Sequence, residues 1–346
     1  MKKIEIIAIL IISLFIFGAI SLFYFSLPVA REQTEKVFEV KKGESIFDIA
    51  KHLEEEGFIK NKYLFVCLTI LRGKERQLKA GKYILSPSMT LQEILDILSK
   101  GKTPIVKITI PEGWNLKEIA QYLEEKNLCQ KEEFFEIVGW PGVDYSKEEN
   151  LPQAQDFSNK FPFLKDKPKN VSLEGYLFPD TYFVKKTATC QEIVKMFLEN
   201  FSKKLIPDLQ EEIKKQKKTV FEIVTMASLL EKEVKTKEDK EIVAGILWKR
   251  LKAGIPLQVD ATIAYITGRK TTKITFEELQ IDSPYNTYKY LGLPLGPISN
   301  PGMESILAAI YSKQSNYWYY LSTPEGKTIF SKTLSEHNKN RAKYLQ

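Results

Sequence analysis

The stretch Thr219-Val-Phe-Glu-Ile-Val-Thr-Met-Ala-Ser-Leu-Leu-Glu-Lys-Glu233 decides the fold, because it carries the strongest helix signal in the chain. Thr219 and Glu222 have the spacing of a capping box, in which each side chain satisfies a free backbone N–H at the helix start. Apolar residues then cover nearly the whole circumference, which predicts a buried central helix. This helix ends in two carboxylates, Glu231 and Glu233.

Carboxylates at the end of a buried helix lose solvation, which raises their pKa and keeps a proton available near neutral pH. A general acid needs such a proton, but a Glu-Lys-Glu sequence is equally typical of a solvated helix end. Glu231 falls on the helical stripe of Val224 and Ala227, whereas Glu233 falls beside Met226 and the leucines. Both glutamates therefore remain candidates for an acid/base role.

Polar residues after the next helical segment, residues 241–250, are candidate ligand contacts. Gln258, Asp260 and Thr262 alternate with apolar residues, which predicts an extended segment with hydrogen-bonding groups on one side, or a strand with one wet face. Tyr285, Asn286 and Thr287 lie in a loop rich in glycine and proline. Aromatic faces and amides suit a saccharide groove, although the same composition serves any rigid loop. Residues 317–321 favour a buried aromatic strand.

Residues 38–59 and 108–129 form a weak internal repeat, in which Gly43 matches Gly113. Each copy predicts a strand, a glycine turn and a helix that begins at Ser45 or Asn115. A further helix is expected from Thr90. The first copy resembles a LysM repeat, which is a carbohydrate-binding module; a structural spacer is the alternative. Residues 131–169 favour an irregular connector.

The N-terminus carries twenty-two residues without a charge, from Ile6 to Leu27. That length is enough to span a bilayer core, and it exceeds the apolar part of a typical signal peptide. We therefore expect a retained single-pass anchor at residues 1–30, with a cleaved signal peptide as the alternative. Lys2 and Lys3 favour an N-terminus inside the cell, so the rest of the chain would lie outside the cytoplasm.

Composition excludes several classes of function. The three cysteines, Cys67, Cys129 and Cys190, are widely spaced, so we expect buried apolar residues and neither a disulfide framework nor a zinc site. Only two histidines are present and they lack metal-ligand spacing, which predicts no metal and no cofactor. The net charge of +7 suits an anionic polymer or an ordinary basic surface, and nothing in its pattern indicates nucleic acid.

With these features in place, the chain resembles the endolytic murein transglycosylase family, also called YceG-like. The resemblance covers residues 37–346 and rests on six stretches that occur in the family's order. They are Leu173-Glu-Gly-Tyr-Leu-Phe-Pro-Asp-Thr-Tyr182, Ala227-Ser-Leu-Leu-Glu-Lys-Glu233, Pro256-Leu-Gln-Val-Asp260, Tyr285-Asn-Thr-Tyr288, Gly292-Leu-Pro-Leu-Gly-Pro-Ile298 and Ser335-Glu-His-Asn338.

The resemblance implies cleavage of the MurNAc–GlcNAc bond within nascent peptidoglycan strands, leaving 1,6-anhydro-MurNAc ends. It implies that Glu233 is the catalytic acid. Glu231 is the second choice, because the residue after Glu233 is Val234, whereas the family pattern has Ser or Thr there. The saccharide contacts that we expect are Gln258, Asp260, Tyr285, Asn286 and Thr287, with Glu174 and Tyr176 as outer members. The expected partners are glycan strands, the plasma membrane and cell-wall synthesis proteins.

The predicted fold class is α+β. It comprises a transmembrane helix at 1–30, a LysM-like α+β module at 31–105, a second small repeat with connector at 106–170, and a mixed α/β catalytic domain at 171–346 that contains the buried catalytic helix. Two alternative functions remain. A hydrolase would use water and leave reducing ends, and a non-catalytic membrane-anchored scaffold would bind peptidoglycan without cutting it.

Overall fold

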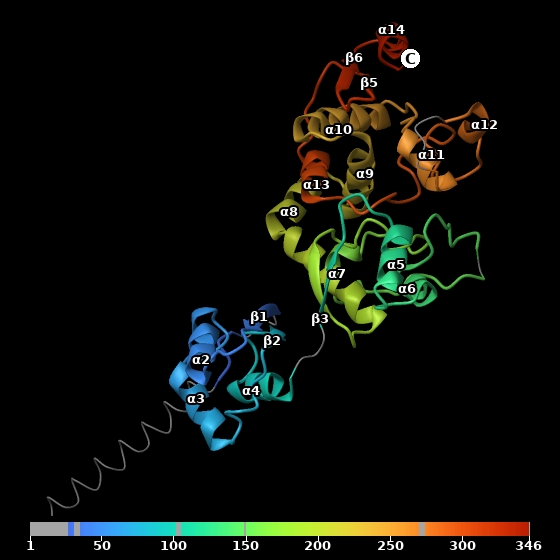
Figure 1. Cartoon of the computed structure of the whole chain (residues 1–346). Helices are drawn as coiled ribbons and strands as arrows, with labels where there is room; N and C mark the ends of the chain where they lie inside the picture. Colours follow the sequence, from blue (N-terminus) through green and yellow to red (C-terminus); the bar gives the residue numbers. More distant parts are fainter. Residues whose placement is uncertain (1–26, 31–34, 102–104, 149, 270–273, 346) are drawn as a thin grey trace, which may run out of the picture. The chain divides into compact units, whose positions relative to one another are not determined.

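The computed structural model describes residues 27–30, 35–101, 105–148, 150–269 and 274–345, and it divides into two compact units (Figure 1). Unit 1 contains the chain up to Ile108 together with 183–187, and unit 2 contains 109–182 and the chain from Ala188. The expected anchor at 1–30 lies outside the described residues except for 27–30. Among the described residues, no helix has both the length and the apolar character needed to cross a bilayer.

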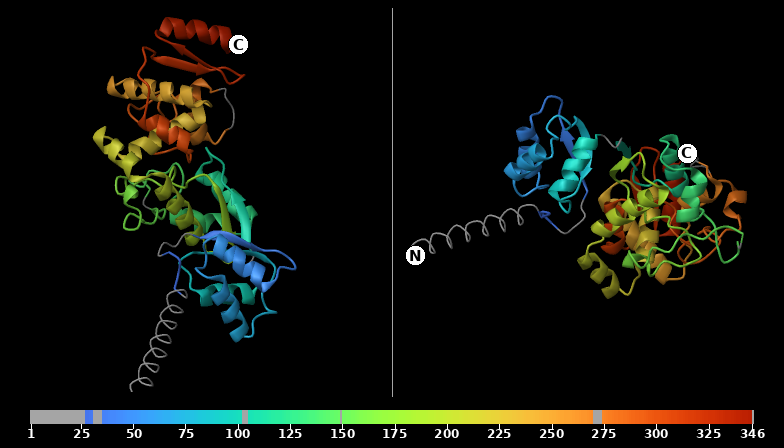
Figure 2. Two further views of the ribbon diagram at one scale, coloured as in Figure 1. Left: turned by 90° about the vertical axis from the view of Figure 1, so that its left-hand side faces the viewer. Right: turned by 90° about the horizontal axis from the view of Figure 1, so that it is seen from below.

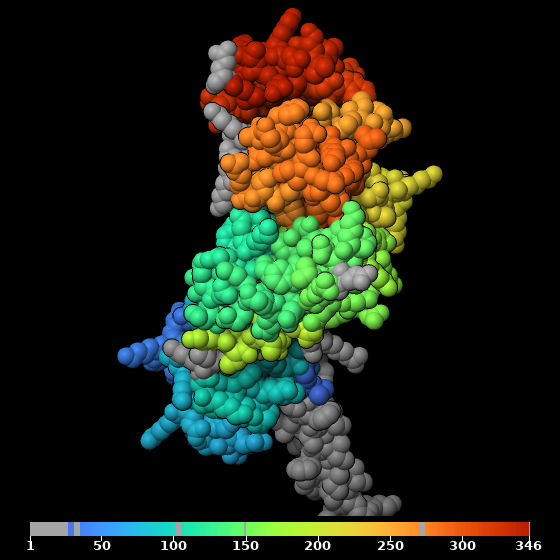
Figure 3. All heavy atoms as spheres, turned by 90° about the vertical axis from the view of Figure 1, so that its right-hand side faces the viewer, coloured from blue at the N-terminus to red at the C-terminus, as the bar shows by residue number. Residues whose placement is uncertain are grey.

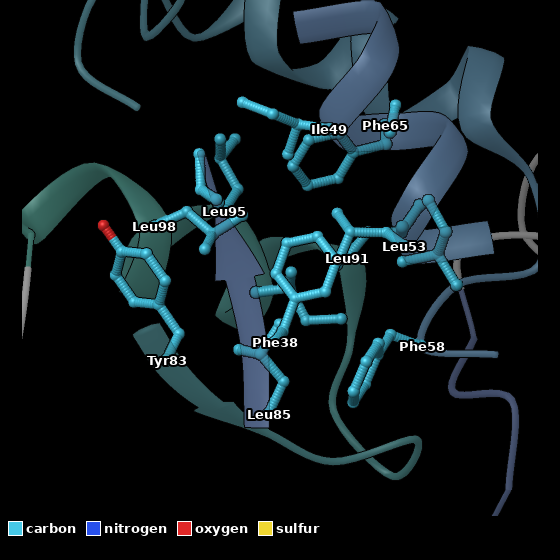
Figure 4. Packing of buried hydrophobic residues seen from close by; sticks show 14 residues of the cluster. Phe38, Ile49, Leu53, Phe58, Phe65, Tyr83, Leu85, Leu91, Leu95 and Leu98 are labelled. Atoms are coloured by element: carbon cyan, nitrogen blue, oxygen red, sulfur yellow. The ribbon is translucent and has the colours of Figure 1, made fainter. Parts of the chain in front are cut away.

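Unit 1 is built on an antiparallel pair of strands, β1 (Lys36–Val40) and β2 (Gly81–Leu85), in which Phe38 lies opposite Tyr83. Its apolar core forms where three helices cover this sheet, and Figure 4 shows Phe38, Leu53 and Leu95 converging there. The order is strand, two helices, strand and a third helix. The helices are α2 (Ile46–Glu55), α3 (Lys62–Leu71) and α4 (Leu91–Lys100).

The helix starts expected at Ser45, Thr90, Asn115 and Thr219 are confirmed. Each of these residues is an N-cap whose side chain accepts from the backbone N–H three residues later, and each forms a complete capping box. Such a cap stabilises a helix by about 1 kcal/mol. The sequence pattern therefore predicts the residue at which each of these helices begins, as well as the presence of the helix.

Unit 2 is mainly helical, and its centre is α9 (Val220–Glu233), which is buried from Ile223 to Leu230 as expected. Helices α8, α10, α11 and α13 pack against α9, and α10 and α13 also contact each other (Figure 1). The helices of this unit are α5 (Leu116–Glu125), α6 (Lys131–Val138), α7 (Cys190–Lys204), α8 (Pro207–Lys215), α9, α10 (Lys237–Lys252), α11 (Asp260–Thr267), α12 (Phe276–Leu279), α13 (Met303–Ile310) and α14 (Leu334–Tyr344), with a 3-10 turn at Pro162–Leu164.

Two further strand pairs complete the described elements. Strands β3 (Ile105–Thr109) and β4 (Thr181–Lys185) form one pair. Strands β5 (Tyr319–Ser322) and β6 (Thr328–Ser331) form an antiparallel hairpin, which lies with α14 at the C-terminal end of unit 2 (Figure 2). In the space-filling view these red C-terminal residues lie directly beside the orange segment of the same unit (Figure 3). The strand expected at 317–321 thus begins slightly later and is half-buried.

Two expectations about local structure are wrong. The stretch 131–169 is not irregular throughout, because α6 opens it and buries Phe134 and Phe135. The segment from Gln258 to Thr262 is not extended, because Gln258 adopts a left-handed φ of 55° and the chain then enters α11. Thr262 is fully buried as a result, and its hydroxyl donates to the Val259 carbonyl at 2.7 Å.

The expectation for the cysteines is also wrong. Cys129 and Cys190 are buried, but they form a disulfide that joins the segment after α5 to the first turn of α7. Cys67 is an exposed free thiol. Positions so far apart in sequence give no pairing signal, because only the packing of α5, α6 and α7 brings the two sulfurs together.

Reduction of this disulfide should destabilise unit 2. The bond closes a loop with a sequence separation of 61 residues, for which the loss of unfolded-state entropy predicts about 4 kcal/mol. Denaturant unfolding of Cys129→Ser should show this loss in the free energy of unfolding. The control variant Cys67→Ser, at an exposed position, should stay within about 0.5 kcal/mol of the wild type. Equal stability of Cys129→Ser and Cys67→Ser would contradict the disulfide.

Candidate active site

The side chain of Glu233 lies at the C-terminal end of α9, where it meets the start of α11. Its Oε1 accepts a hydrogen bond from the backbone N–H of Ala261 at 3.2 Å. Ala261 is the second residue of α11. The N-cap of this helix is Val259, whose side chain provides no hydrogen bond to the first turn. Glu233 therefore takes the place of a capping residue, because the first N–H groups of a helix lack partners within it.

The C-terminal hairpin contacts Glu233 from β5. The hydroxyl of Tyr320 donates to Oε2 at 3.1 Å, and the hydroxyl of Ser322 donates to the Glu233 carbonyl at 3.0 Å. These side chains alternate with Leu321, so both point to the same face of the strand. Glu233 is consequently held by two elements that are far apart in sequence, α11 and β5.

Burial is the main reason that the pKa of Glu233 is raised to about 7, and the negative charge of Asp260 raises it further. The hydrogen bonds from Ala261 and Tyr320 act in the opposite direction, because they stabilise the carboxylate. Asp260 is exposed at the first position of α11, where it accepts a hydrogen bond from the Tyr288 hydroxyl. A carboxyl group with a pKa near 7 can both give and take a proton at neutral pH.

Arg250 in α10 connects the two elements that hold Glu233. Its guanidinium donates to the Gln258 Oε1 at 2.7 Å, just before α11, and to the Trp318 carbonyl at 3.2 Å, just before β5. Arg250 is buried, and it also donates to the Pro256 carbonyl. The rigid fork of donors in a guanidinium makes it suited to fix several backbone segments at once.

Glu231 has a different environment from Glu233. Its Oε2 accepts from the Ser305 hydroxyl at 2.7 Å and from the Gly302 N–H at 3.0 Å, at the start of α13. Its Oε1 lies 3.4 Å from the Lys240 ammonium, and the two side chains are 10% and 4% exposed. These contacts use both carboxylate oxygens to join α9, α10 and α13.

Glu174 and Tyr176 lie in the interior of unit 2. The Glu174 carboxyl accepts from the Leu116 N–H at the start of α5 and from the side chains of Tyr265 and Asn300. Burial raises its pKa to about 8. Tyr176 is fully buried beside Phe163 and Phe201, and its hydroxyl has no hydrogen-bond partner among the described residues. Neither side chain is brought to Glu233.

Tyr285, Asn286 and Thr287 are also buried, and their side chains support the loop that carries them. The Asn286 amide donates to two backbone carbonyls and accepts from the Tyr288 N–H. The Thr287 hydroxyl accepts from the Val259 N–H at 3.0 Å, next to the start of α11. Of the nine residues that the family resemblance assigns to the site, Glu233, Asp260 and Gln258 therefore lie around one solvent-accessible place.

Arg250 and Tyr320 complete this site, and neither is distinguished by the sequence pattern. Arg250 stands in the last turn of α10, where basic residues are common for their effect on the helix dipole alone. Tyr320 belongs to a run of aromatic residues whose composition indicates only a strand. The one available signal is the alternation in β5, which places Tyr320 and Ser322 on one face.

One group of side chains in the described part of the chain has the spacing of a metal site. It consists of Cys129, Glu133 and Cys190. Both of its cysteines are in the disulfide, so their sulfurs are not thiolates that could bind a metal.

Replacement of Glu231 should destabilise the fold. In Glu231→Gln the Lys240 ammonium stays buried without its counter-charge, which predicts a loss of about 3 kcal/mol in the free energy of unfolding. Denaturant unfolding at neutral pH measures this loss. The matched control is Glu211→Gln at an exposed position of α8, which should change stability by less than about 0.5 kcal/mol. Similar values for the two variants would contradict a structural role for Glu231.

Replacement of Glu233 should, in contrast, stabilise the fold relative to the wild type, and this difference should grow as the pH rises. The folded-state pKa of about 7 lies above the ordinary value of 4.5, so ionisation of Glu233 disfavours the folded state. The wild type should therefore lose stability relative to Glu233→Gln between pH 4.5 and pH 7, with a gap that approaches about 3 kcal/mol at pH 8. Unfolding free energies of both proteins from pH 4 to pH 8 test this. A gap independent of pH would rule it out.

Comparison with known proteins shows the family of the chain. The model of the YceG-like family matches residues 38–343. A relative named endolytic murein transglycosylase from Bacillus subtilis (strain 168) is 32% identical over 92% of this chain and 87% of its own length. A relative of the same name from Streptococcus pneumoniae (serotype 2, strain D39) is 32% identical over 88% of this chain, which spans 58% of the pneumococcal protein.

A solved structure shows the same relationship. The crystal structure of a putative yceG-like protein from Listeria monocytogenes is 34% identical in sequence and matches with a TM-score of 0.58. The match covers 89% of this chain and 100% of that one. The resemblance noted in the sequence is thereby confirmed, and the chain belongs to the YceG-like family.

Proposed function

We propose that the chain is an endolytic lytic transglycosylase that cleaves the MurNAc–GlcNAc bond of peptidoglycan strands and leaves 1,6-anhydro-MurNAc ends. The observation that carries this proposal is the environment of Glu233, a carboxyl at the end of a buried helix with a pKa of about 7. The names of the relatives from Bacillus subtilis and Streptococcus pneumoniae support peptidoglycan as the substrate.

In the proposed reaction Glu233 acts twice. As the neutral acid it gives its proton to the GlcNAc oxygen while the bond from that oxygen to C1 of MurNAc breaks. As the carboxylate it then takes the proton of the MurNAc C6 hydroxyl while that oxygen forms a bond to C1. The glutamate ends protonated, and the substrate supplies the nucleophile, so this route requires no second catalytic carboxylate.

The neighbours of Glu233 suit both steps. Burial and Asp260 favour the protonated form that the first step needs, whereas the donors Ala261 and Tyr320 favour the carboxylate that the second step needs. Asp260 and Gln258 are the exposed polar side chains nearest to the start of α11, and they are the saccharide contacts that we propose. The buried residues Tyr285, Asn286 and Thr287 would shape the loop beside them.

We assign the acid to Glu233 and not to Glu231 because of their partners. Both oxygens of Glu231 are engaged with Lys240, Ser305 and Gly302, and the side chain is only 10% exposed. Each oxygen of Glu233 accepts one hydrogen bond among the described residues, which leaves a lone pair on each for a proton or a substrate hydroxyl.

The remaining parts of the chain fit a place at the cell wall. The order of β1, α2, α3 and β2 supports a LysM-like module in unit 1 with a role in holding glycan. A disulfide persists in oxidising compartments, which supports a location outside the cytoplasm. We propose that the apolar segment Ile6–Leu27 anchors the chain in the plasma membrane, near the proteins that synthesise the cell wall.

Mass spectrometry of glycan products tests the proposed function. The full chain in detergent, incubated with uncrosslinked glycan strands, should release fragments with anhydro ends, and Glu233→Gln should lower the rate by about 10²- to 10⁴-fold. Glu231→Gln, assayed at a temperature where it is folded, should keep most of the activity. Reducing ends would indicate a hydrolase, and strand binding without cleavage by the wild type would indicate the scaffold.

A further inference from the structure

The two hydrogen bonds to the Glu233 carboxyl differ in kind. The Ala261 N–H at Oε1 can only donate, so Oε1 acts as an acceptor whether Glu233 is protonated or not. The Tyr320 hydroxyl at Oε2 can donate to a carboxylate and, after rotation about its C–O bond, accept from a carboxylic acid. Oε2 is therefore the oxygen whose partner tolerates a proton.

We propose that Tyr320 is a positioning residue that keeps the transferable proton of Glu233 on Oε2 and stabilises the carboxylate between the two steps of the reaction. This inference rests on the proposed function. In the first step the proton leaves Oε2 for the glycosidic oxygen, and the Tyr320 hydroxyl turns to donate to the Oε2 that has become negative. In the second step the C6 hydroxyl proton arrives at Oε2, and Tyr320 keeps its own proton throughout.

The geometry of β5 supports this role. Ser322 fixes the strand to the carbonyl of Glu233, so the main chain and the side chain of the glutamate are both tied to the same three-residue segment. Arg250 fixes the residue two positions before Tyr320 through the Trp318 carbonyl. Burial, with the nearby Glu233 carboxyl, raises the pKa of the Tyr320 phenol well above its ordinary value, which keeps the hydroxyl protonated.

The charged and titratable groups that face this pair come from several elements. Asp260 of α11 acts on Glu233, and Tyr288, which donates to Asp260, lies beside it. Arg250 of α10 places its positive charge near Tyr320. In the described part of the chain, none of these groups forms a hydrogen bond with Oε2. Removal of the Tyr320 hydroxyl therefore removes the hydrogen bond to Oε2 and leaves these charged groups in place.

The test is a titration of Glu233 in the full chain labelled with ¹³Cδ-glutamate. Its carboxyl signal is identified by its absence from Glu233→Gln. In Tyr320→Phe the pKa of Glu233 should rise by about one unit, because a hydrogen bond to the carboxylate is lost. The matched control is Tyr317→Phe, which removes the hydroxyl from a ring that stacks on Phe330 and should leave the titration unchanged.

A second variant tests the sign of the effect and does not remove the side chain. Substitution of 3,5-difluorotyrosine at position 320 makes the phenol a stronger donor, so the pKa of Glu233 should fall. The basic limb of the pH–rate profile for glycan cleavage should move with the titration, to higher pH in Tyr320→Phe and to lower pH in the fluorinated protein. Tyr320→Phe should also be about tenfold slower at its optimum.

These measurements separate this inference from the proposed function. Absence of glycan cleavage by the wild type would overturn the proposed function, whereas the titration of Glu233 requires no activity. An unchanged titration in both Tyr320 variants, or an equal shift in Tyr317→Phe, would overturn the role of Tyr320. A shift of the titration without any movement of the pH–rate profile would also overturn it, because the proton on Oε2 would then not be the one transferred.

Discussion

The structure of unit 2 depends on the burial of α9, a helix that is apolar almost all round and yet ends in two glutamates. A carboxyl group that is withdrawn from water must find hydrogen-bond donors, because an unpaired buried charge costs several kcal/mol. Both glutamates find backbone donors at the start of another helix. Glu231 meets the start of α13, and Glu233 meets the start of α11.

The difference between the two glutamates follows from what else surrounds each. Glu231 has a buried ammonium, Lys240, as its counter-charge, so its negative charge is matched within the fold. Glu233 has no such cation among its described hydrogen-bond partners, and the charge that shifts its pKa is that of a second carboxylate, Asp260. The first arrangement stabilises the packing of three helices. The second leaves a carboxyl whose proton is held weakly enough to be given away near neutral pH.

Much of the architecture could be predicted from local sequence, because caps and periodicity act over a few residues. The starts of α2, α4, α5 and α9 all follow from Ser, Thr or Asn at the N-cap. The start of α11 could not be predicted in this way. Its N-cap is Val259, and the donors at its first turn are satisfied by Glu233, a residue from another helix.

The candidate site was predictable only in part for the same reason. Glu233, Asp260 and Gln258 lie in motifs whose residue types suggest chemistry. Asn286 and Thr287 look equally suited to bind a sugar, but their polar groups hold the loop together, and only the structure shows those partners. Tyr320 and the cysteine pair depend on contacts between segments far apart in sequence, for which a single sequence carries no signal.

In the proposed reaction one glutamate carries out both proton transfers, and the nucleophile is the C6 hydroxyl of the substrate and not water. Cleavage of glycan strands in water enriched in ¹⁸O tests this most directly, by mass spectrometry of the newly formed MurNAc ends. We expect anhydro ends that contain no ¹⁸O, because the C6 oxygen of the sugar attacks C1. One ¹⁸O atom at each new end would contradict it, since water would then be the nucleophile.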